Sequence, residues 1–269
     1  MRLKWYAMPY IAWMALFTVA PLGLLLYYAT QSSNGFTLAH FAKFFDPLYI
    51  GILLRSLWLA LLCTVICLAL GYPVAYILAR RKEGGLLALL FILPMWMNFL
   101  LRTYAWMSIL ENTGIINKLL LALGFGQVTL LYNSNAVLLG MVYNFLPFMI
   151  LPIMTVLRKM DRSLTESAGD LGANPFEVFR RVTLPLSLPG VISGITMVFM
   201  PAVTTFVISR LLGGSQFMLF GDLIEQQFLQ TADWNFGSAL SVIMMVLMLL
   251  SMAVMNRLGG TDQNKGQLI

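Results

Sequence analysis

Long apolar stretches alternate with short polar connections along almost the whole chain. Six stretches are apolar enough to cross a membrane as helices, since one crossing needs about 20 such residues. We expect these spans at residues 8–29, 54–79, 86–107, 136–157, 190–212 and 237–256. The pattern predicts an all-α, polytopic membrane protein with about six transmembrane helices, in which residues 1–269 form a single transmembrane domain.

The composition supports this prediction and excludes several classes of protein. Hydrophobic residues make up 59% of the chain and charged residues only 10%, whereas soluble domains contain about 25% charged residues. The net charge of +6 does not indicate nucleic-acid binding, because the basic residues are clustered at the ends of the predicted spans. Membrane lipid is therefore an expected partner, and nucleic acid is not.

The distribution of basic residues favours one orientation, because lysine and arginine are enriched in cytoplasmic loops. If both termini are cytoplasmic, 12 basic residues lie inside, namely Arg2, Lys4, Arg80, Arg81, Lys82, Arg158, Lys159, Arg162, Arg180, Arg181, Arg257 and Lys265. Only 5 then lie outside, namely Lys43, Arg55, Arg102, Lys118 and Arg210. We expect a multi-pass protein of the cytoplasmic membrane with both termini inside.

A polar segment, residues 163–190, separates two of the apolar stretches and has the features of two short helices. Ser163 and Glu166 are spaced as a capping box, in which each side chain bonds the backbone N–H at the position of the other. We expect the first helix to end at Gly172, because glycine accepts the left-handed conformation of a helix stop. A surface loop that only caps its own helices is the alternative interpretation.

The second helix of this segment is expected to begin with Asn174 as its cap and Pro175 at its first position. Its apolar residues recur at spacings of three, which predicts a common side for Phe176, Phe179 and Val182. We expect Pro185 and Pro189 to end this helix and to turn the chain back to the membrane. Together the two helices would present a stiff elbow to the cytosol.

The same segment resembles the EAA loop of permease subunits of binding-protein-dependent ABC importers. The resemblance rests on Glu166-Ser-Ala168, on Gly172, and on Val182-Thr-Leu184-Pro185; the family prefers alanine at 167 and isoleucine at 182. It implies the type I ABC importer permease fold, with cytoplasmic EAA coupling helices that dock on a dimer of ATP-binding subunits. The coupling residues carried over are Glu166, Ala168, Gly172, Asn174, Phe176, Phe179 and Pro185.

Further segments are similar to the spermidine/putrescine permeases, and among them to the B-type subunits. These are residues 100–110, 144–152, 206–214 and 233–239. The resemblance implies a non-enzymatic transport subunit of a bacterial inner membrane, a second permease subunit and an extracytoplasmic polyamine-binding protein. ATP and magnesium would be bound by the partner ATPase, because the sequence has no phosphate-binding Gly-x-x-x-x-Gly-Lys-Ser/Thr segment.

A polyamine site requires carboxylates for the ammonium groups and aromatic faces for the methylene stems. The predicted spans contain no acidic residue, so the candidates lie at their outer ends: Tyr104, Trp106, Glu111, Asp222, Glu225, Asp233 and Trp234. The alternative is a set of solvated loop acids and an interfacial aromatic belt. Arg102 and Arg210 lie near the same level, where they would pair with these acids or contact the binding protein.

Other functions fit the sequence less well. An intramembrane enzyme would need paired acids, a nucleophile with a base, or a metal cluster at membrane depth, and the predicted spans offer none. No metal site is expected, because His40 has no second ligand at a suitable spacing. A permease for another small solute, such as an iron complex, a sulfonate or a different amine, stays open. A membrane scaffold that recruits a cytosolic partner also stays open.

Overall fold

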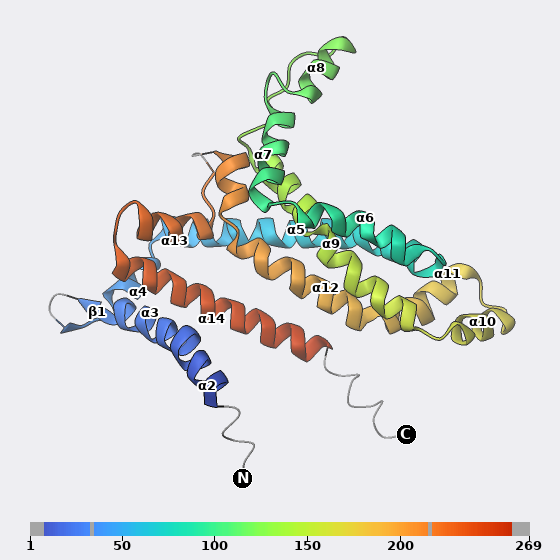
Figure 1. The fold of residues 1–269 in the computed structure, drawn as a ribbon, viewed down its shortest axis with the longest axis horizontal. Helices are drawn as coiled ribbons and strands as arrows, with labels where there is room; N and C mark the ends of the chain where they lie inside the picture. The colour runs from blue at the N-terminus through green and yellow to red at the C-terminus, as the bar shows by residue number, and fades with distance from the viewer. Residues whose placement is uncertain (1–7, 33–34, 215–216, 260–269) are drawn as a thin grey trace.

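The structure is a computed structural model that describes residues 8–32, 35–214 and 217–259, and these are helical almost throughout (Figure 1). The elements in chain order are α2 (Met8–Met14), the π-helix η1 (Ala15–Val19), α3 (Ala20–Thr30), β1 (Gln31–Ser32), β2 (Gly35–Phe36), α4 (Ala39–Phe44), α5 (Pro47–Arg80), α6 (Gly84–Trp96), α7 (Phe99–Leu110), α8 (Ile115–Ala122), α9 (Ser134–Lys159), α10 (Arg162–Asp170), α11 (Pro175–Val178), the π-helix η2 (Phe179–Thr183), α12 (Leu184–Thr204), the π-helix η3 (Ser209–Gly213), α13 (Phe220–Leu229) and α14 (Trp234–Gly259). The two short strands pair antiparallel, with Gln31 opposite Phe36.

Five continuous segments within the described residues are long and apolar enough to cross a membrane. They are Met8–Thr30, Pro47–Arg80, Ser134–Lys159, Pro175–Thr204 and Trp234–Arg257. The second begins earlier than residue 54, because Asp46 accepts a hydrogen bond from the Leu48 N–H (2.9 Å) and Pro47 occupies the first helical position. Of the basic residues predicted to be cytoplasmic, Arg2, Lys4 and Lys265 lie outside the described residues.

The span expected at 86–107 is bent, because the chain turns by 90° between α6 and α7. Pro94 lies in the last turn of α6, and Asn98 caps α7 by accepting a hydrogen bond from the Leu100 N–H at 2.8 Å. Together they end one helix and begin another within an apolar run. With this bent pair counted as one span, the number of spans reaches six.

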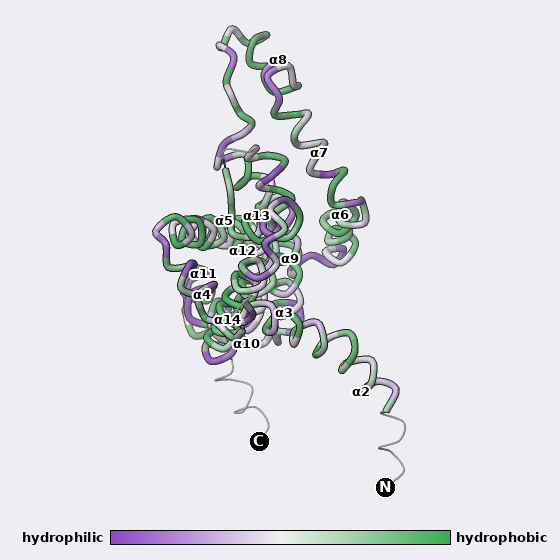
Figure 2. Tube along the Cα trace, turned by 90° about the vertical axis from the view of Figure 1, so that its left-hand side faces the viewer, coloured by the Kyte–Doolittle hydropathy of each residue, from purple (hydrophilic) through white to green (hydrophobic). Residues whose placement is uncertain are grey.

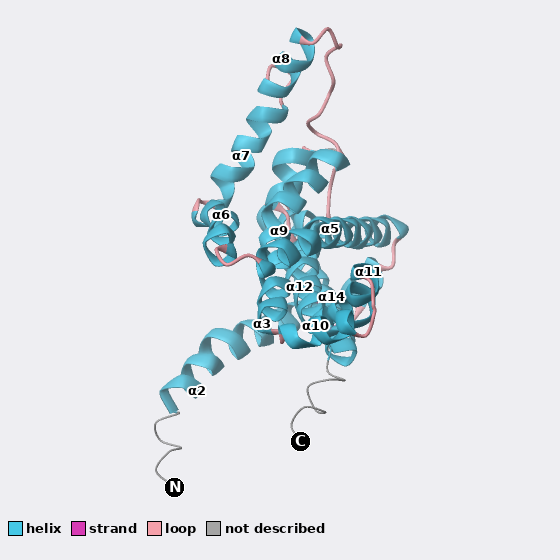
Figure 3. Cartoon of the chain, turned by 90° about the vertical axis from the view of Figure 1, so that its right-hand side faces the viewer, coloured by secondary structure: helices cyan, strands magenta, loops and turns pink. Residues whose placement is uncertain are grey.

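The core of the bundle is formed by α5, α9 and α12, while α3 packs along α14 (Figure 1). Hydrophobic positions dominate the trace of these helices (Figure 2). Many large apolar side chains nevertheless point outward, among them Trp58, Leu90 and Leu250. Such a surface is compatible with lipid as the solvent of the bundle. Figure 3 shows α7 and α8 as an arm that projects beyond the bundle.

Two glycines of α12 allow this helix to approach α9 closely. A Cβ atom at Gly190 would lie 3.0 Å from the Pro152 carbonyl oxygen and 3.1 Å from the Ile153 Cα. A Cβ atom at Gly194 would lie 2.7 Å from the Met149 sulfur. The spacing of four residues puts both glycines on one face, as in the small-residue interfaces of other membrane helices.

A Gly190→Leu variant is expected to destabilise the bundle, because the new side chain must push the α9 backbone away. Overpacking of this kind costs about 1–3 kcal/mol, which thermal unfolding of the purified chain in detergent would detect. Gly51→Leu in α5 is the matched control, since a Cβ at Gly51 has no atom within 4 Å. Equal stability of the two variants would contradict the close packing of α9 and α12.

The two ends of the bundle differ in the elements that they carry. The helices α10 and α11 lie at one end, and α4, α13 and the β-hairpin lie at the other (Figure 1). The polar segment 163–190 and the acidic residues of α13 therefore lie far apart, on opposite sides of the apolar bundle. This separation agrees with the predicted topology, in which the two regions face opposite sides of a membrane.

Candidate functional site

The first helix of the elbow, α10, begins at Arg162, and its cap is Asp161 instead of the expected Ser163. The Asp161 carboxylate accepts a hydrogen bond from the Ser163 N–H at 3.0 Å, which holds the pKa of Asp161 below its usual value. Ser163 already lies inside the helix, so it is not at the N-cap position, which Asp161 occupies. Aspartate is itself a good N-cap, and its position before Arg162 is the signal that identifies this start.

The end of α10 is where the sequence predicts it, at Gly172. This residue has a φ of +86°, and the Ala173 N–H donates to the Ala168 carbonyl at 3.1 Å. The left-handed glycine lets the chain reverse and leaves few carbonyls unpaired. A Cβ atom at this position would meet no atom within 4 Å, so the requirement for glycine comes from the backbone conformation.

The second helix starts as expected, with a complete capping box. The Asn174 side chain accepts from the Glu177 N–H (2.9 Å), and the Glu177 carboxylate accepts from the Asn174 N–H (3.2 Å). The expectation that Pro185 and Pro189 end this helix is wrong, because α11 runs through η2 into α12, and Pro189 lies inside α12. The π-helical turn η2 ends at Thr183, shortly before Pro185, and changes the hydrogen-bond register there, so the continuous helix accommodates a residue without an N–H.

The expected common side for Phe176, Phe179 and Val182 is also wrong. Phe176 is 69% exposed, whereas the Phe179 ring lies edge-on against Tyr72 and Tyr76 of α5, with centroids 5.8 Å apart in each pair. The π-helical turn that begins at Phe179 changes the angle between successive side chains. Phe179 therefore attaches the elbow to the bundle, while Phe176 is free to contact another molecule.

A buried hydrogen bond strengthens this attachment. The Tyr72 hydroxyl lies 2.8 Å from the Ser187 hydroxyl, which joins α5 to the first turn of α12. Both side chains are buried, so a lost partner would leave an unsatisfied polar group. The contacts of Tyr72 thus link a long span to the elbow through one aromatic pair and one hydrogen bond.

A Phe179→Ala variant is expected to lower the thermal stability of the purified chain. Two edge-to-face pairs are lost, which corresponds to about 1–3 kcal/mol. Phe176→Ala removes the same side chain from an exposed position and serves as the control. If both variants melt at the same temperature, Phe179 does not attach the elbow.

The outer surface of the elbow carries an apolar residue that the sequence reasoning missed. Leu171 is 89% exposed, directly before Gly172. It lines a hollow of about 320 Å³ together with Ala168, Gly172, Ala173, Glu177, Val178, Arg181 and Val182. An apolar residue at a helix stop in an otherwise polar segment is the signal that could have identified it. Leu171 and Phe176 are suited to fill pockets of a protein partner.

At the opposite end of the bundle, the structure brings two of the predicted acids together. Asp222 and Glu225 of α13 line a cavity of about 400 Å³ that also contains Arg210. The Arg210 guanidinium forms an ion pair with Glu225. The other lining residues are Gly214, Phe217, Met218, Gln226 and Gln230.

Asp222 is the most unusual ionisable group of this outer cavity. Burial raises the pKa of its carboxyl to about 6, although hydrogen bonds from Ser209 and from the Leu219 N–H (2.9 Å) favour the charged form. Gln226 and Gln230 follow Asp222 at intervals of four residues. This polar stripe on one helix face was present in the sequence and would have indicated the two glutamines as lining residues.

The other predicted substrate-path residues lie elsewhere. Asp233 pairs with Lys43 at 3.5 Å and shares a different cavity with the exposed Trp234. Glu111 lines a third cavity in the arm. Trp106 packs edge-on against Tyr143 with centroids 5.3 Å apart, and the Tyr104 ring is 46% exposed. The seven candidates therefore do not form one site: Asp222 and Glu225 share one cavity, and Asp233 and Trp234 share another.

Comparison with known proteins places this geometry in context. Residues 2–260 match the family described as binding-protein-dependent transport system inner membrane component. The spermidine/putrescine transport system permease protein PotB of Escherichia coli (strain K12) is 38% identical over 255 residues, which cover 91% of this chain and 93% of that protein.

Two further relatives extend this similarity. The PotB protein of Haemophilus influenzae is also 38% identical, over 91% of this chain and 90% of its own length. Among solved structures, a bacterial alginate ABC transporter in complex with a pentasaccharide-bound periplasmic protein contains a chain that superposes with a TM-score of 0.82. The superposition covers 95% of this chain and 92% of that one at 18% identity, and it shows a shared fold.

Proposed function

Because this chain belongs to the family of binding-protein-dependent transport system inner membrane components, we propose that it carries polyamines through the membrane for an ATP-driven importer. The chain is a multi-pass, non-enzymatic ABC importer permease of the type I fold. Spermidine and putrescine are the proposed substrates. The observation that supports them is the similarity to PotB proteins along nearly the whole chain.

The elbow is the proposed contact with a dimer of ATP-binding subunits. Leu171 and Phe176 are exposed for docking, while Phe179 and the Tyr72–Ser187 hydrogen bond connect the same elbow to α5 and α12. A capped, rigid helix pair transmits a rigid-body displacement better than a flexible loop. Closure of the ATPase dimer, which binds ATP and magnesium, would thus alternate the access of the pore between the two sides.

The outer cavity of Asp222 and Glu225 is the proposed entry point for the polycation. Carboxylates suit its ammonium groups, and Phe217 provides an aromatic face beside them. An extracytoplasmic binding protein would deliver the substrate to this end of the bundle, and a second permease subunit would complete the pore. In this orientation the elbow and both termini face the cytoplasm, in agreement with the bias of basic residues.

ATP-dependent uptake of labelled spermidine tests the proposal. The chain is reconstituted in vesicles with the second permease, the ATP-binding subunits and the binding protein. Uptake should require ATP and should be reduced by an excess of unlabelled spermidine or putrescine. A complex that hydrolyses ATP with its binding protein present, but imports no polyamine, would refute the substrate assignment.

A permease for a different small solute is the second candidate. Arg210 favours it, because a guanidinium in the outer cavity opposes the entry of a cation. Its ion pair with Glu225 also removes one of the two carboxylates from use. Competition of uptake by other amines, sulfonates and iron complexes distinguishes the two candidates.

A further inference from the structure

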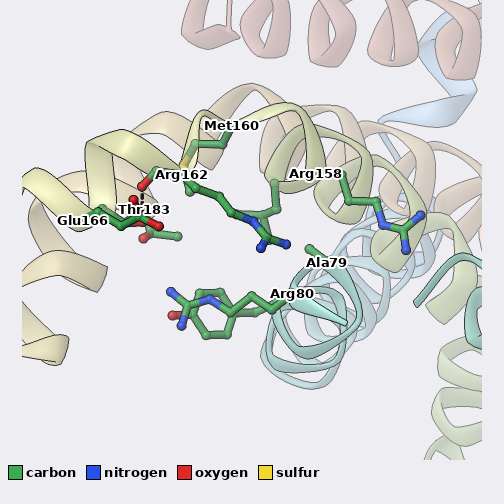
Figure 4. Close-up of a pocket in the computed structure, with 10 residues that line it drawn as sticks. Ala79, Arg80, Arg158, Met160, Arg162, Glu166 and Thr183 are labelled. Carbon is green, nitrogen blue, oxygen red and sulfur yellow. Dashed lines mark hydrogen bonds between the residues drawn. The ribbon is translucent and has the colours of Figure 1, made fainter. Parts of the chain in front are cut away.

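A second cavity, of about 340 Å³, lies beside the elbow at the end of the bundle opposite Asp222 (Figure 4). Three arginines from three elements line it: Arg80 at the end of α5, Arg158 of α9 and Arg162 of α10. Glu166 contributes the one carboxylate among the lining residues. The lining thus has an excess of positive charge.

None of these three guanidinium groups has a carboxylate within ion-pair distance in the part of the chain that the structure describes. Arg80 lies over the Tyr76 ring at 4.2 Å, and Figure 4 shows Arg80 and Arg162 extending along opposite sides of the hollow. Arg158 points away from them and lies against Gly84 and Gly85, at the N-terminus of α6. Arg80 and Arg162 are therefore the groups placed to contact a ligand.

A buried hydroxyl in the lining has no partner. Thr183, the last residue of η2, is fully buried, and its Oγ1 makes no hydrogen bond within the described residues. An unsatisfied buried hydroxyl is unfavourable unless another molecule completes it. Thr183 and Glu166 both line the cavity (Figure 4).

We propose that this cavity, bounded by Arg80, Arg162 and Thr183, binds a phosphate group at the membrane surface. Two planar guanidinium groups and one hydroxyl can donate charge-assisted hydrogen bonds to the several oxygens of a tetrahedral phosphate. Basic pockets at the ends of membrane helices suit phospholipid head groups, and a soluble phosphate offers the same chemistry. The bound group would join α5, α10 and η2, and so hold the elbow against the bundle. The inference does not depend on the polyamine assignment.

Binding to the full-length chain, purified in detergent and stripped of lipid, tests this site. Phosphatidylglycerol is titrated in one arm and inorganic phosphate in the other, with phosphatidylcholine as the zwitterionic reference, and retained ligand is counted by native mass spectrometry. An Arg80→Gln/Arg162→Gln double variant should bind at least about tenfold more weakly, because it loses two charge-assisted contacts. An Arg81→Gln/Lys159→Gln variant loses the same charge beside the cavity and should bind as the unmodified chain does.

The two arms distinguish the source of the phosphate. Selective binding of phosphatidylglycerol identifies a lipid head group, and binding of inorganic phosphate without lipid identifies a soluble ligand. The site is refuted if neither ligand binds, or if both double variants weaken binding equally, because general surface charge would then explain the result.

A variant of Thr183 tests separately whether its hydroxyl contacts the ligand or serves only the fold. Thr183→Val keeps the shape and removes the hydroxyl, so binding of the same ligand should weaken by about fivefold to tenfold. The ligand-free variant should be at least as stable as the unmodified chain, because an unsatisfied group has been removed. Lower stability of the ligand-free variant with unchanged binding would assign Thr183 to the fold alone.

Discussion

Uptake by a Gly172→Val variant is expected to fall by about tenfold, because a left-handed conformation costs an L-residue about 1–2 kcal/mol and a β-branched residue tolerates it poorly. Gly172 has a φ of +86° and ends α10. Valine would move the chain out of this conformation and displace Leu171 from its exposed position. The measurement is ATP-dependent uptake by the reconstituted complex, normalised to the amount of inserted permease.

Two further variants separate backbone strain from added bulk. Gly172→Asn should retain most uptake, since asparagine accepts the left-handed region and open space surrounds the position. Gly169→Val adds the same side chain three residues earlier, where φ is ordinary and no atom lies within 4 Å of a Cβ. Normal uptake by Gly172→Val, with normal co-purification of the ATPase, would refute the docking role of the elbow.

The sequence predicts the spans well where the apolar run is bounded by strong helix signals. The exact helix starts differ from the predicted span starts at 54 and 136, because Asp46 caps α5 at Pro47 and Asn133 caps α9 at Ser134. The size of the bend between α6 and α7 is not visible in the hydropathy, which averages over Pro94 and Asn98. These two residues are a stop and a start signal, but in an apolar run only local hydrogen bonding reveals them.

The elbow was predictable to a similar extent. Gly172 and the capping box of Asn174 are local features, and both occur where the sequence places them. The inward turn of Phe179 was not predictable, because it depends on a π-helical turn and on rings from a span about 100 residues earlier. Tertiary packing against Tyr72 and Tyr76 therefore decides which apolar residues of the elbow stay exposed.

The outer acids show the limit of reasoning from residue type alone. Their common location outside the spans is visible in the sequence, but their pairing is not. Asp233 forms an ion pair with Lys43, and Glu225 forms one with Arg210. For Asp222, burial has the largest effect on the pKa of the carboxyl and raises it. Distances between elements determine these differences, and no spacing along the chain encodes them.

Neutralising the carboxylates of the outer cavity is expected to reduce spermidine uptake strongly. Asp222→Asn should lower it by about tenfold, since a lost contact to a charged group corresponds to about 1.5–3 kcal/mol. Glu225→Gln should lower it as well, because it leaves the Arg210 guanidinium unpaired in the cavity, where it opposes a cation. The amide oxygen that Asp222→Asn introduces can still accept from the Leu219 N–H, so α13 should remain capped. Glu111→Gln and Asp233→Asn, in separate cavities, are the comparison variants. Normal uptake by all four would remove these acids from the proposed path.

The pH dependence gives this prediction a second readout. Because burial raises the pKa of Asp222 to about 6, lowering the outside from about pH 7.5 to about pH 5 should protonate the carboxyl and reduce uptake. A raised carboxyl pKa means that the folded state prefers the protonated form of Asp222. Its contribution to the stability of the fold is therefore largest below the ordinary pKa of 3.8, and it is lost as the pH rises through about 6. Protonation of Asp222 therefore does not unfold the protein in this window, and a fall in uptake reports on the ionised carboxylate. Asp222→Asn should flatten the pH profile, and an unchanged profile would exclude Asp222 as the titrating group.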